Sequence, residues 1–475
     1  MNGQKRILFI TLFLTTFSGA KAFALPTLSE AGDFNQPLKL PPEPQTTPQP
    51  QTRQQPPYDP DHLQLQDLFK ISYRAATPVL QSEVTIEQTQ AQFQQLQAQD
   101  SFQLDLQGRY TVREYQNQSQ VNPKLALHGR KTLYDFGRLE MQQQASKIAA
   151  QAGRQNRGYQ QARYRLQLMK AYFDVLLADM RYRVLNEKMA VVYVGLDKAR
   201  DLHEKGELSD VDLAKKNYEY QQILAQRNQA SLLQQENRRI LANLMGFPEA
   251  LPDQLQIPNL KKLQKNLEQL PELDRLIKLG QQRSPQLLAL QKQVAAQQAK
   301  VNAAKAQKRP QLVAEGWVGS LSGYHDKYEG RWRFDLGLEV PLYDAGLNQG
   351  QVAEARAGLH QALAQLQAQQ QQLTDEISHL YFQLKSTQNQ IKADQALIDF
   401  SDLYLDYSRG LYEWEEKTDL GDAMVQVSEA DYQNLKTQLQ AALNWTQLLI
   451  LLGFEPTPEW VNPEIQQVLL QTAQK

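Results

Sequence analysis

Two regions of the chain alternate apolar and polar residues with a period of two, the pattern of strands with one apolar face. In the first region, Leu104, Leu106 and Tyr110 alternate with Asp105 and Arg109. The pattern predicts two hairpins, with strands at about 102–113 and 124–134 in the first and at about 311–319 and 331–341 in the second.

The segments that connect these strands read as turns. A polar turn containing Asn117, Asn122 and Pro123 is expected in the first hairpin. The Gly/Ser/Tyr-rich stretch 319–330 is expected to form an exposed loop in the second.

Helical patterns flank both hairpins. Residues 138–205 contain no proline and space apolar residues three and four apart, which predicts one helix of about 100 Å. A matching helix is expected over 348–417. Both are rich in Ala and Gln. Residues 64–100 predict a helix interrupted near Pro78.

The second half of the chain repeats the residue pattern of the first half. Pro78 corresponds to Pro285 at an offset of 207 residues, and Asp135 corresponds to Asp344 at an offset of 209. A nearly constant offset indicates an internal duplication. The predicted organisation is a signal peptide at 1–22, a Pro/Gln-rich arm at 23–60, a first repeat at 61–250 with a helical hairpin at 138–246, a linker at 251–270, a second repeat at 271–456 with a helical hairpin at 347–452, and a C-terminal tail at 457–475.

The N-terminus has the pattern of a secretory signal. Lys5 and Arg6 precede an apolar run over 7–17, and cleavage is expected near Ala22 or Ala24. A membrane anchor is disfavoured because the run is well short of the ~20 residues that span a bilayer. The following arm is proline-rich and is expected to be extended. The sequence therefore predicts an exported protein.

Composition excludes several functions. The 51 basic and 52 acidic residues nearly cancel and show no basic cluster, which argues against nucleic-acid binding. Cysteine is absent, and the six histidines are scattered without metal-ligand spacing. No phosphate-binding loop or nucleophile elbow occurs. We expect neither an enzyme nor a bound cofactor or metal.

The strands have the length of transmembrane strands, about 9 to 11 residues. Four strands cannot close a barrel, and open edges are not tolerated in hydrocarbon, so further copies of the chain must complete it. Two copies would give a filled barrel of eight strands, and three a barrel of twelve with a lumen. The alternative is that the strands form a small soluble sheet packed on helices. If the protein is a conduit, the trimer is favoured, because only the larger barrel leaves a lumen.

Each strand-to-helix junction carries a matching motif. Asp135 and Asp344 stand where a side-chain oxygen can cap free N–H groups, and Gly137 and Gly346 permit a sharp change of direction. We expect these motifs to be structural. The full set of junction residues is Tyr134, Asp135, Gly137, Pro341, Tyr343, Asp344 and Gly346.

From about 61 to 456 the chain resembles the TolC family of outer-membrane efflux proteins. The resemblance rests on the duplication, on the sequence from Val340 to Gly346, and on the breaker from Gly206 to Leu213. It implies a mainly α protein with a transmembrane β-barrel: four strands per chain in a 12-strand barrel of a homotrimer, plus a periplasmic α-barrel. It also implies a periplasmic adaptor and an inner-membrane transporter as partners, and contact with outer-membrane lipid.

Under this resemblance, the tips of the helical hairpins form the entrance where an adaptor docks. The residues that correspond are Gly206, Glu207, Leu208, Ser209 and Asp212 in the first tip and Leu420 and Gly421 in the second. The second tip departs from the family pattern, because Thr418 stands where glycine aligns and Met424 stands opposite Asp212.

Acidic residues crowd both tips, and threefold symmetry would turn any that face the lumen into a carboxylate ring. The candidates are Asp210, Asp419 and Asp422. The family's paired entrance carboxylates align with Ala423 and Gln426 here. A solvated cluster at the helix ends is the alternative.

The sequence thus predicts a passive exit channel through the outer membrane and periplasm for a tripartite efflux or type I secretion system. A non-channel periplasmic adaptor or coiled-coil spacer is the alternative. An adaptor would have one helical hairpin, whereas this chain has two equivalent ones and two strand pairs.

Overall fold

The computed structural model describes residues 58–59, 62–71, 76–115, 118–319, 331–413 and 420–457. The chain divides into a unit of residues 1–55 and a unit of residues 56–475, and all elements below belong to the second. The predicted signal peptide, nearly all of the proline-rich arm, the loop over 320–330 and the tail from 458 lie outside the described residues, as does Asp419.

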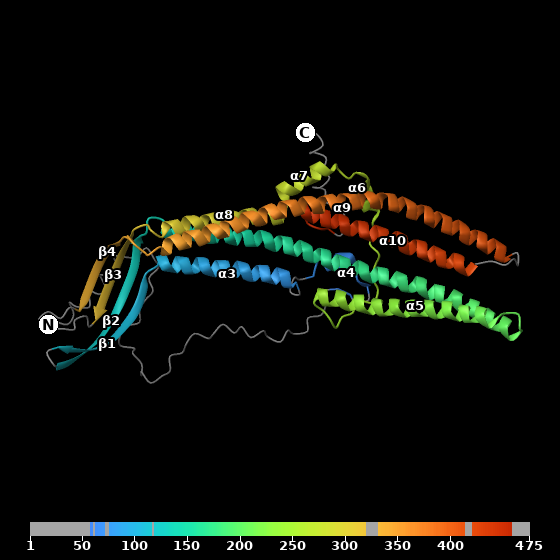
Figure 1. Cartoon of the computed structure of the whole chain (residues 1–475), viewed down its shortest axis with the longest axis horizontal. Helices are drawn as coiled ribbons and strands as arrows, with labels where there is room; N and C mark the ends of the chain where they lie inside the picture. The colour runs from blue at the N-terminus through green and yellow to red at the C-terminus, as the bar shows by residue number, and fades with distance from the viewer. Residues whose placement is uncertain are drawn as a thin grey trace. The chain divides into compact units, whose positions relative to one another are not determined.

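Four strands form one antiparallel sheet in the order β1-β2-β3-β4 (Figure 1). They are β1 (Gln103–Tyr115), β2 (Gln118–Tyr134), β3 (Gln311–Gly319) and β4 (Trp332–Glu339). Pairing of β2 with β3 joins the two repeats into a single sheet. Within the described chain, β1 and β4 are the edges.

The first hairpin is longer than the sequence pattern indicates. Asn122 and Pro123, expected in a turn, lie in β2 opposite Thr111 and Tyr110 of β1. Proline cannot donate to a ladder, so it is confined to places with one partner strand. Among the described residues Pro123 meets this condition, because β2 is paired with β3 only from Ala126 onwards. In the second hairpin β4 is two residues shorter at its C-terminal end than expected.

Nine helices occur in the described residues. They are α2 (Leu65–Leu68), α3 (Thr77–Asp100), α4 (Arg138–Glu204), α5 (Asp210–Met245), α6 (Lys261–Glu268), α7 (Leu273–Arg283), α8 (Pro285–Ala306), α9 (Leu347–Glu413) and α10 (Leu420–Leu451). Pro78 and Pro285 lie in the first turns of α3 and α8, where no N–H partner is needed. Helix α6 lies within the stretch interpreted as a linker.

The long helices α4 and α9 each belong to two layers. Next to the sheet, α3 packs on α4, α4 on α8 and α8 on α9; farther from it, α5 packs on α4, α4 on α10 and α10 on α9 (Figure 1). In both layers the helices therefore lie side by side in a single row. None of the described helices is long and apolar enough to cross a membrane.

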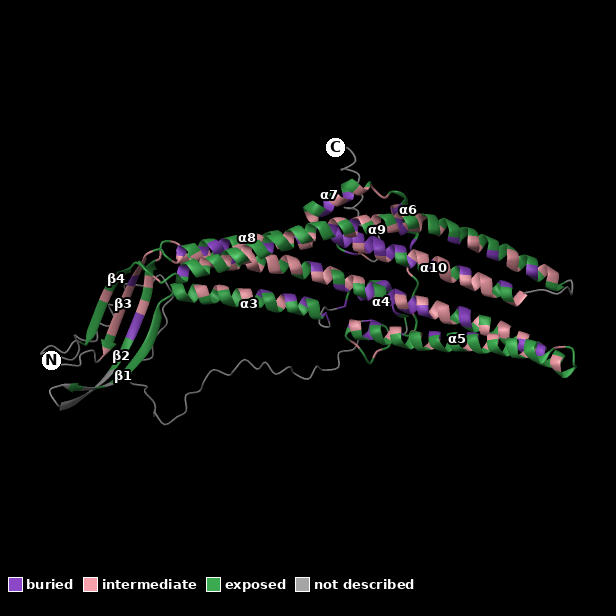
Figure 2. Ribbon diagram, in the orientation of Figure 1, coloured by how far each residue is buried: buried purple, intermediate pink, exposed green. Residues whose placement is uncertain are grey.

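The main hydrophobic core lies where the short helices α6 and α7 meet the middle of the long ones (Figure 2). Tyr172 and Phe173 of α4 are fully buried there. The Tyr172 hydroxyl lies 3.0 Å from the Leu63 carbonyl oxygen and 2.6 Å from that of Gln256. Burial raises the pKa of the Tyr172 hydroxyl far above its ordinary value. These contacts tie the N-terminal segment and the inter-repeat connection to α4.

Candidate functional site

One face of the sheet is apolar and bare. Leu106, Leu127, Val318 and Trp332 occupy one cross-strand row, and pairing keeps their side chains on the same face. All four are exposed, and Trp332 retains 73% of its accessible surface. A continuous apolar surface of this kind marks contact with lipid or protein.

The opposite face carries polar side chains that bond to one another. Asp105, His128, Trp317 and Arg333 form one row across all four strands. The His128 Nδ1 lies 3.1 Å from Asp105 Oδ1, the His128 ring stacks on Trp317 at 4.6 Å, and the Arg333 guanidinium lies 5.0 Å from the Trp317 ring centre. The sheet therefore has one apolar and one polar face, the alternation that the strands of a membrane barrel have.

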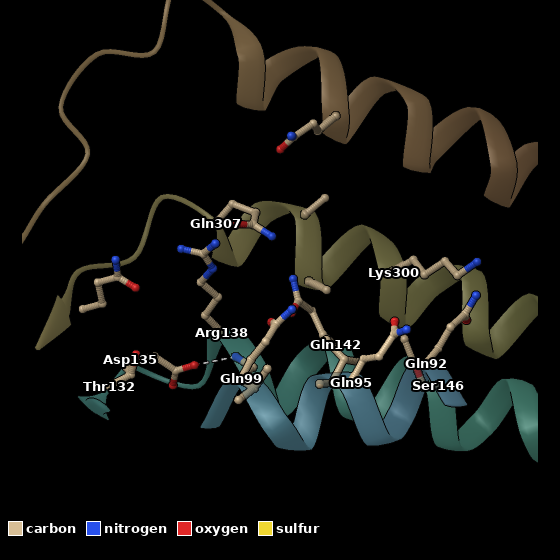
Figure 3. Close-up of a pocket in the computed structure, with 17 residues that line it drawn as sticks. Gln92, Gln95, Gln99, Thr132, Asp135, Arg138, Gln142, Ser146, Lys300 and Gln307 are labelled. Carbon is tan, nitrogen blue, oxygen red and sulfur yellow. Dashed lines mark hydrogen bonds between the residues drawn. The ribbon is translucent and has the colours of Figure 1, made fainter. Parts of the chain in front are cut away.

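The junction aspartates cap the long helices. Asp135 accepts hydrogen bonds from the backbone N–H of Gly137 at 3.0 Å and of Leu139 at 2.6 Å, the second drawn as the dashed line in Figure 3. Asp344 accepts from Gly346 at 3.1 Å and from Asn348 at 3.0 Å. The two repeats thus use one geometry, and each carboxylate satisfies two of the free donors of a helix start.

The charge of Asp344 is favoured by this cap. The backbone N–H of Asn348 is the main cause that lowers the pKa of the Asp344 carboxyl, with smaller help from Gly346 and Lys308. Pro341 precedes this junction, while Tyr343 and Tyr134 leave most of their rings exposed beside their caps.

Both junctions also contain a left-handed pair of residues. Gly137 and Gly346 have φ of +79° and +92°, and the residues before them, Phe136 and Ala345, have φ of 55° and 52°. The sequence indicated the glycines. It gave no signal for Phe136 or Ala345, because neither residue type favours this conformation.

The first hairpin tip is a tight, fully bonded turn. Gly206 has φ of +75° and its N–H donates to the His203 carbonyl at 2.8 Å, while the N–H of Glu207 donates to Leu202 at 2.9 Å. This bonding ends α4 with an αL glycine. Ser209 then starts α5, because its hydroxyl accepts from the N–H of Asp212 at 3.1 Å. Leu208 is half-buried between the two helix ends.

The two tips differ in their packing. A side-chain carbon at Gly421 would lie 2.9 Å from Val191 of α4, so the start of α10 lies directly against α4. Leu420 is half-buried beside it. Val191 precedes the end of α4 by 13 residues, so the first tip extends about 20 Å beyond this contact. The start of α10 in the second hairpin therefore lies at the level of Val191 in the first hairpin, and not at the level of the first tip.

The described acidic residues of the two tips have different surroundings. Asp210 lies 2.7 Å from His203 Nε2 and its side chain is 96% exposed. Asp212 accepts from the Ser209 hydroxyl at 2.7 Å. Asp422 is exposed in the first turn of α10, and Ala423 beside it is buried. In the described residues no group of three or more potential metal ligands occurs.

A groove runs between the helices next to the sheet. Its two adjoining hollows have volumes of about 660 and 600 Å³ and are lined by α3, α4, α8 and α9 together. Figure 3 shows Gln92, Gln95 and Gln99 of α3, Gln142 of α4 and Gln307 of α8 around the same space. We call this surface the glutamine groove. The sequence showed the glutamines but not which of them share one face.

These features define a class: a mainly helical protein with long paired helices and one four-stranded sheet that has an apolar and a polar face. Residues 276–454 match the family model described as outer membrane efflux protein. No curated protein matches the chain.

Solved structures share this fold at low sequence identity. A membrane protein from Pseudomonas aeruginosa is 20% identical with a TM-score of 0.65, and the match covers 83% of this chain and 90% of that one. The Campylobacter jejuni CmeC outer membrane channel is 16% identical with a TM-score of 0.65, over 85% and 89%. The open-state Neisseria gonorrhoeae MtrE outer membrane channel is 18% identical with a TM-score of 0.62, over 84% and 91%.

The match to the outer membrane efflux protein model lies in the second repeat, and the solved structures are similar to the chain in fold. The fold of the chain is the TolC-like one, with barrel strands followed by a helical tunnel, as the sequence predicted. The matching model describes an outer membrane efflux protein, and the CmeC and MtrE structures are outer membrane channels.

Proposed function

We propose that three copies of this chain form a passive exit duct for a tripartite efflux or type I secretion system. The observation that carries the proposal is the sheet with one bare apolar face, one polar face and two open edges. In hydrocarbon, unpaired backbone groups at β1 and β4 cost several kcal/mol each, so neighbouring copies must pair them. Three such sheets supply a barrel wide enough for a lumen.

The helical tips are the proposed contact with the rest of the system. A periplasmic adaptor would dock on Gly206, Glu207, Leu208, Ser209 and Asp212 of the first tip, and on Leu420 and Gly421 of the second. An inner-membrane transporter would supply the energy, since the chain has no nucleotide-binding motif. Carboxylates from Asp210, Asp419 and Asp422 are the proposed entrance ring.

The test is electrical and is made on the full-length protein exported and purified from outer membranes. We expect an oligomer that migrates differently after heating and that conducts ions in planar bilayers. Asp422→Asn together with Asp419→Asn should weaken the block of this current by divalent cations, with Glu207→Gln, in the first tip, as the control. A monomer, or an oligomer that conducts nothing, would contradict the proposal.

A further inference from the structure

The glutamine groove is almost free of charge. Its lining consists mainly of glutamine, alanine and a few hydroxyl side chains. The charged residues along it are Asp135, Arg138 and Lys300. Asp135 is engaged at the helix start, where the partial positive charge of α4 offsets its own. Amides both donate and accept hydrogen bonds, so this surface suits hydrated solutes with hydroxyl or amide groups.

Lys300 is the exception along the middle of the groove. It is exposed on α8 and lines both hollows, which makes it the residue they share. Within the described chain no hydrogen bond or ion pair engages its ammonium group. Asp135 and Arg138 line only the hollow nearer the sheet. Among the residues that line the groove, Lys300 is therefore the positive charge of its middle, and Arg138 is a second one at the end nearer the sheet.

Two cations on α4 contrast with Lys300, because one is covered and the other is paired. The Lys147 ammonium lies 5.2 Å from the ring centre of Phe93, and Arg157 lies 3.6 Å from Glu83. Neither residue lines the groove. The contrast is informative, because Lys147 follows Ser146, which lines the same hollow as Lys300. The neighbouring cation at this level is thus turned away from the groove.

We infer that the glutamine groove is the anion-favouring section of the conduit, with Lys300 as the residue that holds the negative charge of a hydrophilic solute. The inference rests on the proposed function, since it takes the groove shared by four helices as the inner wall of the duct. Copies of the chain around one axis repeat Lys300 as a positive ring, and a ring of one sign sets the charge preference of a pore. The acidic tips are of opposite sign.

The experiment compares ion selectivity of reconstituted channels under a KCl gradient. Lys300→Gln continues the amide lining, Lys300→Arg keeps the charge, and Lys147→Gln removes one positive charge at the same level outside the groove. We expect Lys300→Gln to lower the chloride-to-potassium permeability ratio by roughly twofold or more at low salt, where screening is weak. The other two variants should match the wild type.

Current block supplies a second readout. Hexagalacturonate, an anionic sugar, should block the wild type for longer than uncharged maltohexaose does, and Lys300→Gln should remove this difference. Conducting channels in which Lys300→Gln changes neither readout would overturn the inference alone. An intact oligomer that never conducts would overturn the proposed function and this inference with it.

Discussion

At the scale of single residues, Asp431 of α10 sits in an unfavourable environment. Desolvation raises the pKa of its carboxyl above the ordinary 3.8, the carboxylate of Asp402 on α9 raises it further, and Arg183 on α4 lowers it only in part. A raised pKa in the folded state means that ionisation of Asp431 costs stability at neutral pH. The cost is absent below the ordinary pKa of 3.8, grows as pH rises from there to the folded-state pKa, and stays constant above it.

Asp431→Asn should therefore raise the thermal midpoint of the purified protein at pH 7, and this gain should shrink as pH falls towards 4. Midpoints measured at one protein concentration across pH check it. Asp406→Asn is the control, because Asp406 already has a partner in Arg409 at 3.5 Å. A gain that is the same at every pH would argue against the electrostatic cause.

At the scale of elements, the two long helices depend on their caps. Asp135→Ala leaves the first N–H groups of α4 without an acceptor and should destabilise the protein by about 1 kcal/mol. Asp135→Asn keeps an acceptor oxygen and should lose less. Denaturant unfolding of the two variants tests the order. Equal losses would mean that the cap contributes through charge alone.

Some of these helices and strands could be predicted from the sequence and others could not. Helices α4 and α9 could be predicted because 67 residues each lack proline and keep one period. The start of β2 could not, since Asn122 and Pro123 resemble a turn and only the partner strand makes them extended. The grouping of glutamines from four helices into one groove was also hidden, because it depends on packing between segments far apart in sequence.

At the scale of the whole molecule, the sheet and both helical layers are rows of packed elements. The elements at the two ends of each row have a neighbour in that row on one side only. On one side lie β1, α3 and α5, and on the other β4 and α9. Apolar side chains stay exposed along these helices, including Leu232 on α5 and Leu403 on α9 at 67% and 71%. Burying a leucine contributes roughly 1.5 to 3 kcal/mol, so stripes of this kind favour a closed ring of copies.

Leu403→Glu should therefore shift the detergent-solubilised protein from trimer towards monomer, because a carboxylate would be buried without a partner at each of the contacts in the ring. The measurement is the mass of the complex by light scattering at matched concentrations. Leu202→Glu is the control, since Leu202 is also exposed but lies near the end of α4, where α4 is paired with α5 in the first hairpin. If the ring closes through α9, Leu403→Glu dissociates the complex and Leu202→Glu leaves it whole. Dissociation by both variants, or by neither, would place the contact between copies elsewhere.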